Sequence, residues 1–128
     1  MLFISPTLQR DSENETNKMS VRTIYEQAEL NDIKNNIGDR VLVMMISAWW
    51  HERSEDFIPT YKALAREFRA LNFIKTDIAA SPGIAANYEI NQLPSFLFFR
   101  NSNEMRGNRI EGLDEKTLRC TLERLDKL

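Results

Sequence analysis

Short runs of apolar residues recur along the chain and predict buried β-strands. Residues 41–46 are continuously apolar and include valine and isoleucine, a pattern typical of a strand buried on both faces of a sheet. Residues 73–77 and 95–99 predict two further short strands, and the second of these carries three phenylalanines. A shorter extended segment is predicted at residues 21–25.

The segments between these runs have helical spacing. Residues 26–36 predict a first helix. A stronger pattern follows Ser54, which we expect to be the N-cap residue, and Pro59 lies inside this pattern and is expected to kink the helix. A brief helix is predicted at residues 81–88, and a last helix follows Gly112. The apolar positions that we assign to the core faces of the second and last helices are Phe57, Tyr61, Leu64, Phe68, Leu71, Leu118, Leu122 and Leu125.

The predicted order of strands and helices is β-α-β-α-β-α-β-β-α. Residues 100–104 predict a polar turn and residues 105–110 a weaker strand, so the last two strands would form a hairpin. This order favours an α/β fold with a central mixed β-sheet flanked by α-helices. Residues 1–19 are polar after the first few positions and have no period, so we expect a disordered tail there and one domain at residues 20–128.

Composition narrows the possible function classes. The chain has 128 residues and a net charge of −2, and no apolar stretch approaches the length of a membrane span, so neither a nucleic-acid nor a membrane partner is expected. The chain has a single cysteine, Cys120, and a single histidine, His51. One cysteine excludes an intrachain disulfide and favours a reducing, cytoplasmic setting. The same two counts argue against a metal site, and no cofactor is expected.

Several local strings, taken in order, resemble the thioredoxin family over about residues 21–127. They are VLV at residues 41–43 followed by AWW at residues 48–50, Pro59, FIKTDI at residues 73–78, YEINQLPSF at residues 88–96, and Arg100-Asn101 with Gly112 before the last helix. The resemblance implies a thioredoxin-like fold. It also implies a cis peptide bond before Pro94, and a groove in which backbone groups of Leu93 pair with an extended peptide.

One departure from the family pattern bears directly on activity. With Trp50 placed on the family's tryptophan, the family's Cys-Gly-Pro-Cys is replaced by four residues without sulfur: His51, Glu52, Arg53 and Ser54. Dithiol exchange needs one thiolate to attack a disulfide and a second thiol to resolve the mixed disulfide. The family's buried acid, six positions before its first cysteine, is also replaced, by Met45. We therefore assign no catalytic residue and expect no protein-disulfide reductase activity.

The first hypothesis is a redox-inactive domain that binds a protein or an extended peptide. Neighbouring residues of an extended chain face opposite ways, so at least one of Trp49 and Trp50 is expected to be exposed beside the groove. Exposed aromatic side chains are favoured anchors for protein partners. With Leu93 and Pro94 they form the predicted peptide groove. The alternatives are that both tryptophans pack under the loop and that Pro94 is only structural.

His51 and Ser54 have a chemical and a structural interpretation. They would act together as a base and a nucleophile, although the sequence places no acid to orient the imidazole. The structural alternative is an exposed loop residue followed by a helix cap.

Cys120 supports a second hypothesis, in which a lone thiol takes part in thioredoxin-related redox homeostasis. It lies about 200° around the last helix from Leu118 and is expected to face outward or sit at the helix edge. Arg119 and Arg124 would favour its thiolate form. The alternative is an incidental surface thiol. A structural subunit of a larger assembly is a third possibility, and the sequence carries no indication of an oligomeric state.

Overall fold

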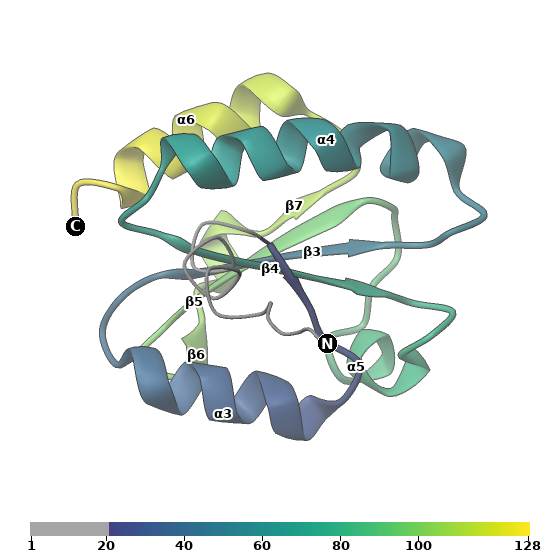
Figure 1. Ribbon diagram of the computed structural model, residues 1–128, viewed down its shortest axis with the longest axis horizontal. Helices are drawn as coiled ribbons and strands as arrows, with labels where there is room; N and C mark the ends of the chain where they lie inside the picture. Colours follow the sequence, from purple (N-terminus) through teal and green to yellow (C-terminus); the bar gives the residue numbers. More distant parts are fainter. Residues whose placement is uncertain (1–20) are drawn as a thin grey trace, which may run out of the picture.

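The computed structural model describes residues 21–128, and its centre is a six-stranded mixed β-sheet (Figure 1). The strands are β2 (Arg22–Thr23), β3 (Leu42–Ser47), β4 (Asn72–Asp77), β5 (Ser95–Arg100), β6 (Asn103–Glu104) and β7 (Ile110–Glu111). Their order across the sheet is β2-β4-β3-β5-β6, and β7 pairs with β5. Strands β2, β4 and β3 are parallel, whereas β5 is antiparallel to β3.

Helices cover both faces of this sheet. They are α3 (Gln27–Ile37), α4 (Glu52–Glu67), α5 (Pro82–Asn87) and α6 (Glu115–Leu125), with a short 3₁₀ helix, η1 (Arg106–Asn108). Figure 1 shows α4 and α6 on one face and α3 and α5 on the other. Side chains of β3 alternate between the two layers: Val43 and Met45 pack with the residues of α4 and α6, and Met44 and Ile46 pack on the opposite side. The predicted α/β architecture, a mixed sheet flanked by helices, is confirmed.

The strand register brings several loops together at one end of the sheet. Ser47, the last residue of β3, lies opposite Asp77 at the end of β4. On the other side of β3, Ile46 lies opposite Ser95, the first residue of β5, and Ser95 in turn lies opposite Glu111 of β7. The loop after β3, the segment before β5 and the segment after β7 therefore share this end, which is on the right in Figure 1.

The start of α4 differs from the prediction. The helix begins at Glu52, its N-cap residue is His51, and Ser54 is its third residue and fully buried. The prediction of Ser54 as the cap was therefore wrong. It relied on the preference of serine for cap positions, but an imidazole nitrogen is also an acceptor that can reach the backbone N–H groups of the first turn. The helix continues through Pro59.

The strand predicted at residues 105–110 is also wrong. η1 occupies Arg106–Asn108, and β7 contains only Ile110–Glu111. Gly107 and Asn108 favour turns, and the weak apolar pattern there does not overcome that preference. The predicted N-terminal tail lies outside the described residues. Among residues 21–128, no helix has the length and apolar character needed to cross a membrane.

Candidate functional site

The loop after β3 is a tight turn that displays two tryptophans. The backbone N–H of His51 donates to the Ala48 carbonyl at 2.9 Å, which closes a four-residue turn with Trp49 and Trp50 at its tip. β3 ends at Ser47, and Ala48 after it is fully buried, whereas the two residues at the tip of the turn are not. Trp49 is 70% exposed and Trp50 is 57% exposed. The alternative in which both tryptophans pack under the loop does not describe this structure.

The His51 side chain turns back and caps α4. Its Nδ1 accepts a hydrogen bond from the Ser54 backbone N–H at 3.2 Å and lies 2.7 Å from the Ser54 Oγ. Because Nδ1 accepts, the ring proton of the neutral imidazole is on Nε2, and the Ser54 hydroxyl donates to Nδ1 as well. Ser54 is fully buried. The hydroxyl is thus enclosed and directed at the cap, so this pair is not arranged as a base with an accessible nucleophile.

The segment before β5 is fixed at both ends but leaves one residue unpaired. The Leu93-Pro94 peptide bond is cis. The Pro94 carbonyl accepts from the Gly112 N–H at 2.8 Å, and the Ser95 Oγ donates to the Gln92 carbonyl at 2.6 Å. Between these two anchors, neither the N–H nor the C=O of Leu93 makes a hydrogen bond to any residue within 21–128. Leu93 is half-buried at the end of the sheet that carries the tryptophan turn.

Gly112 is needed where β7 meets this segment. Its φ is 92°, a left-handed value that side chains with a Cβ rarely adopt. A Cβ at this position would also lie 2.8 Å from the Oε1 of Gln92. The positive φ that glycine allows lets its N–H reach the Pro94 carbonyl, and this bond holds the segment in place from the β7 side.

The face of β3 that packs against α4 carries an apolar residue, Met45, near the turn. Met45 is fully buried and lies opposite Phe96 in the ladder between β3 and β5. The Phe96 ring contacts Phe57 of α4 edge-on, with ring centroids 5.8 Å apart. Since Met45 is not ionisable, β3 supplies no buried acid or base at this position. Residues 21–128 also contain no group of three His, Cys, Asp or Glu side chains that would hold a metal ion.

Cys120 lies away from this site. It is exposed on α6, and the adjacent Arg119 binds Glu67, the last residue of α4, through two hydrogen bonds of 2.7 and 2.9 Å. Ser54 comes thirteen residues before Glu67 on the same helix, which is a distance of about 20 Å along the axis. Arg124, the other predicted neighbour of the thiol, donates to Asn108. The structure therefore separates Cys120 from the tryptophan turn.

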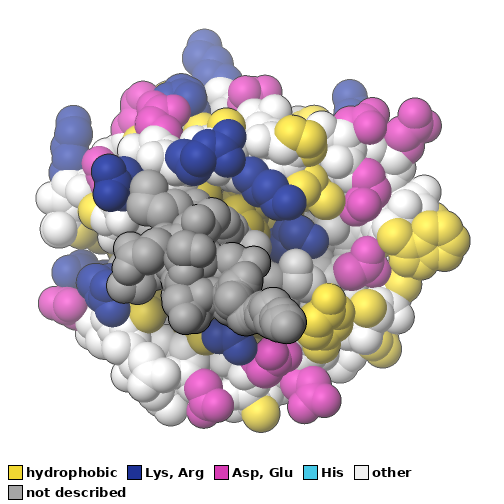
Figure 2. Space-filling view, in the orientation of Figure 1, with side chains coloured by type: hydrophobic (Ala, Val, Ile, Leu, Met, Phe, Trp, Pro, Cys, Tyr) yellow, Lys and Arg dark blue, Asp and Glu magenta, His cyan; other side chains and the backbone are white. Residues whose placement is uncertain are grey.

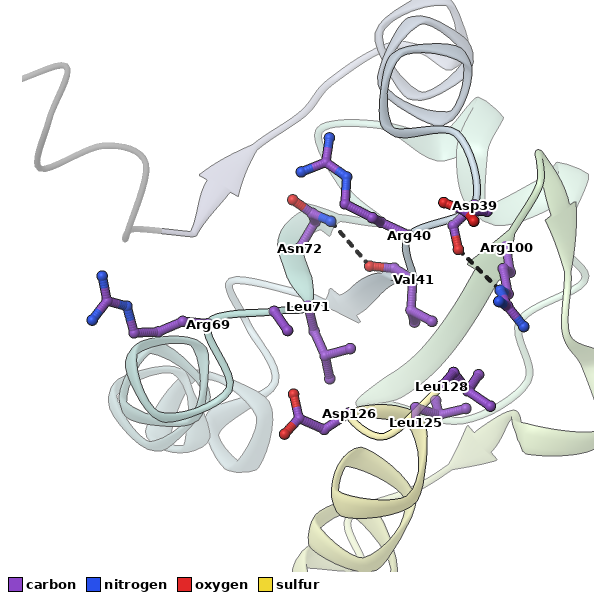
Figure 3. A pocket seen from close by; sticks show the side chains of 11 residues that line it. Asp39, Arg40, Val41, Arg69, Leu71, Asn72, Arg100, Leu125, Asp126 and Leu128 are labelled. Carbon is purple, nitrogen blue, oxygen red and sulfur yellow. Dashed lines mark hydrogen bonds between the residues drawn. The ribbon is translucent and has the colours of Figure 1, made fainter.

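A pocket that the sequence did not indicate lies at the opposite end of the sheet (Figure 3). Its volume is about 340 Å³. Asn72 Nδ2 donates to the Val41 carbonyl at 3.2 Å on one wall, and Arg100 Nε donates to the Asp39 carbonyl at 2.9 Å on another. The other lining residues are Arg40, Arg69, Ala70, Leu71, Leu125, Asp126 and Leu128. Its arginines come from three separate segments, a proximity that no local pattern reveals.

Known proteins resemble this chain over nearly all of its described length. The family model described as Thioredoxin matches residues 20–124. The chain is 26% identical over 105 residues to the thioredoxin of Oryctolagus cuniculus, covering 82% of this chain and 98% of that protein. It is also 26% identical over 107 residues to the peptide-N(4)-(N-acetyl-beta-glucosaminyl)asparagine amidase of Caenorhabditis briggsae, where the match covers 83% of this chain and 17% of that protein. Among solved structures, the Fasciola hepatica thioredoxin has a TM-score of 0.77 at 29% identity and covers 81% of this chain and 98% of its own. The predicted thioredoxin-like fold is thereby confirmed.

Proposed function

The chain belongs to the thioredoxin family, and from this premise we propose that it is a thioredoxin-like domain without dithiol-reductase activity that binds a protein or an extended peptide. The binding groove is formed by the turn residues Trp49, Trp50 and His51 and by Leu93 and Pro94. The observation that carries the proposal is the backbone of Leu93, which makes no hydrogen bond to residues 21–128 and lies at the end of the sheet that carries two exposed indoles.

The chemistry of the loop supports the loss of dithiol exchange. Exchange proceeds by thiolate attack and needs a second thiol to release the substrate. The residues at the start of α4 are His51 and Ser54, which bond to each other as a helix cap. Neither forms a persistent bond to sulfur that a second group would exchange. Met45 beneath them supplies no proton acceptor.

The geometry around Leu93 supports peptide binding. An extended peptide pairs with a strand edge or an open backbone segment through main-chain hydrogen bonds, and side-chain pockets then add specificity. Leu93 offers one N–H donor and one C=O acceptor, held in place by the bonds at Pro94 and Ser95. Trp49 and Trp50 provide large aromatic surface with few rotatable bonds, which suits them as anchors.

A lone-thiol role for Cys120 is the second candidate, and the exposure of this thiol is the observation that favours it. An exposed thiol on α6 would form a mixed disulfide with a partner or a small thiol without involving the groove. This candidate predicts activity that depends on Cys120 alone.

We also propose a reducing, cytoplasmic setting. A chain with one cysteine gains nothing from an oxidising compartment, since it has no intrachain disulfide to form. Fractionation of cells expressing the untagged chain tests this, and recovery in a membrane or secreted fraction would contradict it.

The test of redox inactivity is insulin reduction with dithiothreitol as the electron source. Three proteins are compared: the unchanged chain, Cys120→Ser, and the double variant His51→Cys, Ser54→Cys. We expect the unchanged chain and Cys120→Ser to match the rate of dithiothreitol alone and the double variant to exceed it. Activity in the unchanged chain that disappears in Cys120→Ser would replace the proposal with the lone-thiol role.

The test of the groove is a backbone experiment on the chain labelled with ¹⁵N. Titration with extended peptides is expected to shift the Leu93 amide resonance. The affinity for the peptide is expected to fall when Trp49 is changed to Ala. Tyr25→Ala is the matched control, because Tyr25 is an aromatic residue 57% exposed that lies two residues beyond β2, and β4 separates β2 from β3. Equal effects of the two variants would contradict the assignment of the groove.

A further inference from the structure

Three carboxylates follow the two tryptophans of the turn, in the first turns of α4. Glu52 and Asp56 lie exposed in the first turns of α4, immediately after the tryptophans, and Glu55 is half-exposed between them. The single cation in this stretch is Arg53. Within residues 21–128, none of these three acids takes part in an ion pair. Figure 2 shows hydrophobic side chains at the end of the molecule that carries the β3–α4 loop, on the right, with Asp and Glu side chains beside them.

Acidic residues from other elements face the same end. Asp77 ends β4 opposite Ser47, and Glu89 stands in the loop that leads to Leu93. Glu111 lies opposite Ser95, although it also accepts a bond of 3.5 Å from Arg109. Residues 48–57, 77–80, 88–95 and 110–114 contain seven acids and one arginine, the acids being Glu52, Glu55, Asp56, Asp77, Glu89, Glu111 and Asp114. Of these, Asp77 and Asp114 accept hydrogen bonds from nearby residues along the chain, and Glu111 is paired with Arg109 just outside these ranges. This asymmetry is local, because the net charge of the whole chain is only −2.

The opposite end of the sheet has the reverse character. Arg40, Arg69 and Arg100 line the pocket there (Figure 3). Asp39 and Asp126 offset part of that charge. A cationic ligand is therefore attracted to the tryptophan end and is not attracted to the pocket end, which gives the molecule one preferred face for it.

We propose that the groove selects basic segments: extended peptides that carry arginine or lysine at the positions that reach Trp49 and Trp50. This inference rests on the proposed function and names the chemistry of its partner. Two independent features favour the same ligand. An indole face attracts a cation, and a guanidinium stacks on it well. The neighbouring carboxylates of Glu52 and Asp56 then pair with the same cation, while Leu93 pairs with the peptide main chain.

The experiment uses the fluorescence of the chain itself. The chain has two tryptophans, and both are in the turn, so their emission reports on the groove alone. Three peptides of equal length share one apolar framework and carry Arg, Ser or Glu at alternate positions. We expect the Arg peptide to bind about tenfold more tightly than the Ser peptide, because an exposed ion pair and a cation–aromatic contact each contribute a few-fold. The Glu peptide is expected to bind most weakly, and the affinity for the Arg peptide should fall as salt is added.

A charge-neutralised variant locates the effect. The double variant Glu52→Gln, Asp56→Asn is expected to bind the Arg peptide about fivefold more weakly and the Ser peptide with unchanged affinity. The matched control is Asp39→Asn with Asp126→Asn, which removes the same charge from the opposite end and is expected to change neither affinity. Far-ultraviolet circular dichroism checks that α4 is retained, and the salt dependence of the unchanged chain tests the idea without any substitution.

The outcomes separate this inference from the proposed function. If the Ser and Arg peptides bind equally and without salt dependence, the groove exists but its preference for basic partners is refuted. If the control variant weakens the Arg peptide as much as the groove variant does, the attraction is a general charge effect and the inference also fails. If none of the three peptides binds, both the inference and the proposed peptide groove are overturned.

Discussion

The substitution Tyr61→Phe isolates one buried hydroxyl that links α4 to the sheet. Tyr61 has no exposed surface, and its one OH proton is shared between the Ile74 carbonyl at 2.7 Å and the Val43 carbonyl at 3.1 Å. The ring packs edge-on against Phe73, with centroids 5.5 Å apart. Phenylalanine keeps this packing and removes only the donor, so two buried carbonyls lose a partner. We expect the free energy of unfolding at neutral pH to fall by about 2 kcal/mol.

The same hydroxyl makes the stability depend on alkaline pH. Burial raises the pKa of Tyr61 well above its usual value of about 10. Above pH 10 the unfolded chain releases this proton while the folded chain keeps it, so the folded state binds more protons. Stability from this group is therefore complete below pH 10 and falls as pH rises, by up to about 1.4 kcal/mol per pH unit. Phenylalanine has no proton to release, so the variant does not lose stability in this way. The difference in the free energy of unfolding between the two proteins should therefore shrink toward zero about 1.5 units above pH 10.

The assay is urea unfolding followed by circular dichroism, repeated from neutral to strongly alkaline pH for both proteins. Tyr25→Phe serves as the control, because it removes an exposed phenol and should follow the unchanged chain. A loss below about 0.5 kcal/mol at neutral pH would show that the carbonyls do not need this donor. A constant difference between the two proteins above pH 10 would refute the role of burial.

Three further changes test the cap, the glycine and the ion pair. His51→Ala removes the acceptor that caps α4 and is expected to lower the free energy of unfolding, measured in urea, by about 1 kcal/mol. His51→Asn keeps an acceptor and should lower it by less. Equal losses in the two variants would argue against the cap. Gly112→Ala places a Cβ on a residue with a φ of 92°, 2.8 Å from the Gln92 Oε1. The free energy of unfolding is expected to fall by about 1–2 kcal/mol and the peptide affinity to weaken. An unchanged melting curve would contradict this expectation. Arg109→Met leaves Glu104, whose side chain is 9% exposed, without its two-bond partner, and should cost about 3 kcal/mol. Adding Glu104→Gln should recover most of that loss, and a double variant as unstable as the single one would show that the charge is not the cause.

The core of the fold could be predicted from local patterns. The continuous apolar run at residues 41–46 corresponds to β3 (Leu42–Ser47) within one residue. Such a run is buried on both faces wherever it lies, so its structure is insensitive to the rest of the chain. The apolar residues predicted for the second helix are likewise buried, although α4 ends at Glu67 and the last two of them, Phe68 and Leu71, follow it. The errors at the start of α4 and in residues 105–110 fell where polar residues decide the outcome, since several polar groups compete there for the same backbone bonds.

The candidate site could be predicted only in part. The tryptophans and Leu93-Pro94 were identified from strings in the sequence, but their exposure and hydrogen bonding depend on the turn at Ala48 and on the register of β5 and β7. The role of His51 as a cap had no local signal, because imidazole is an uncommon cap. The arginine pocket was missed altogether, because its lining residues come from separate segments.

The sequence by itself determined the sulfur chemistry that is open to this protein. The chain has one cysteine, and it lies far along the chain from the loop after β3. No fold can add a second thiol, and no fold can make Met45 of β3 an acid. Tertiary structure decided which groups meet and which stay free. It placed the tryptophan turn, several carboxylates and the Leu93 backbone, which is unpaired within residues 21–128, at one end of the sheet and set Cys120 apart from them. The physical reason is that strand register and helix packing join residues distant in the chain, and these long-range contacts leave no periodic trace in the sequence.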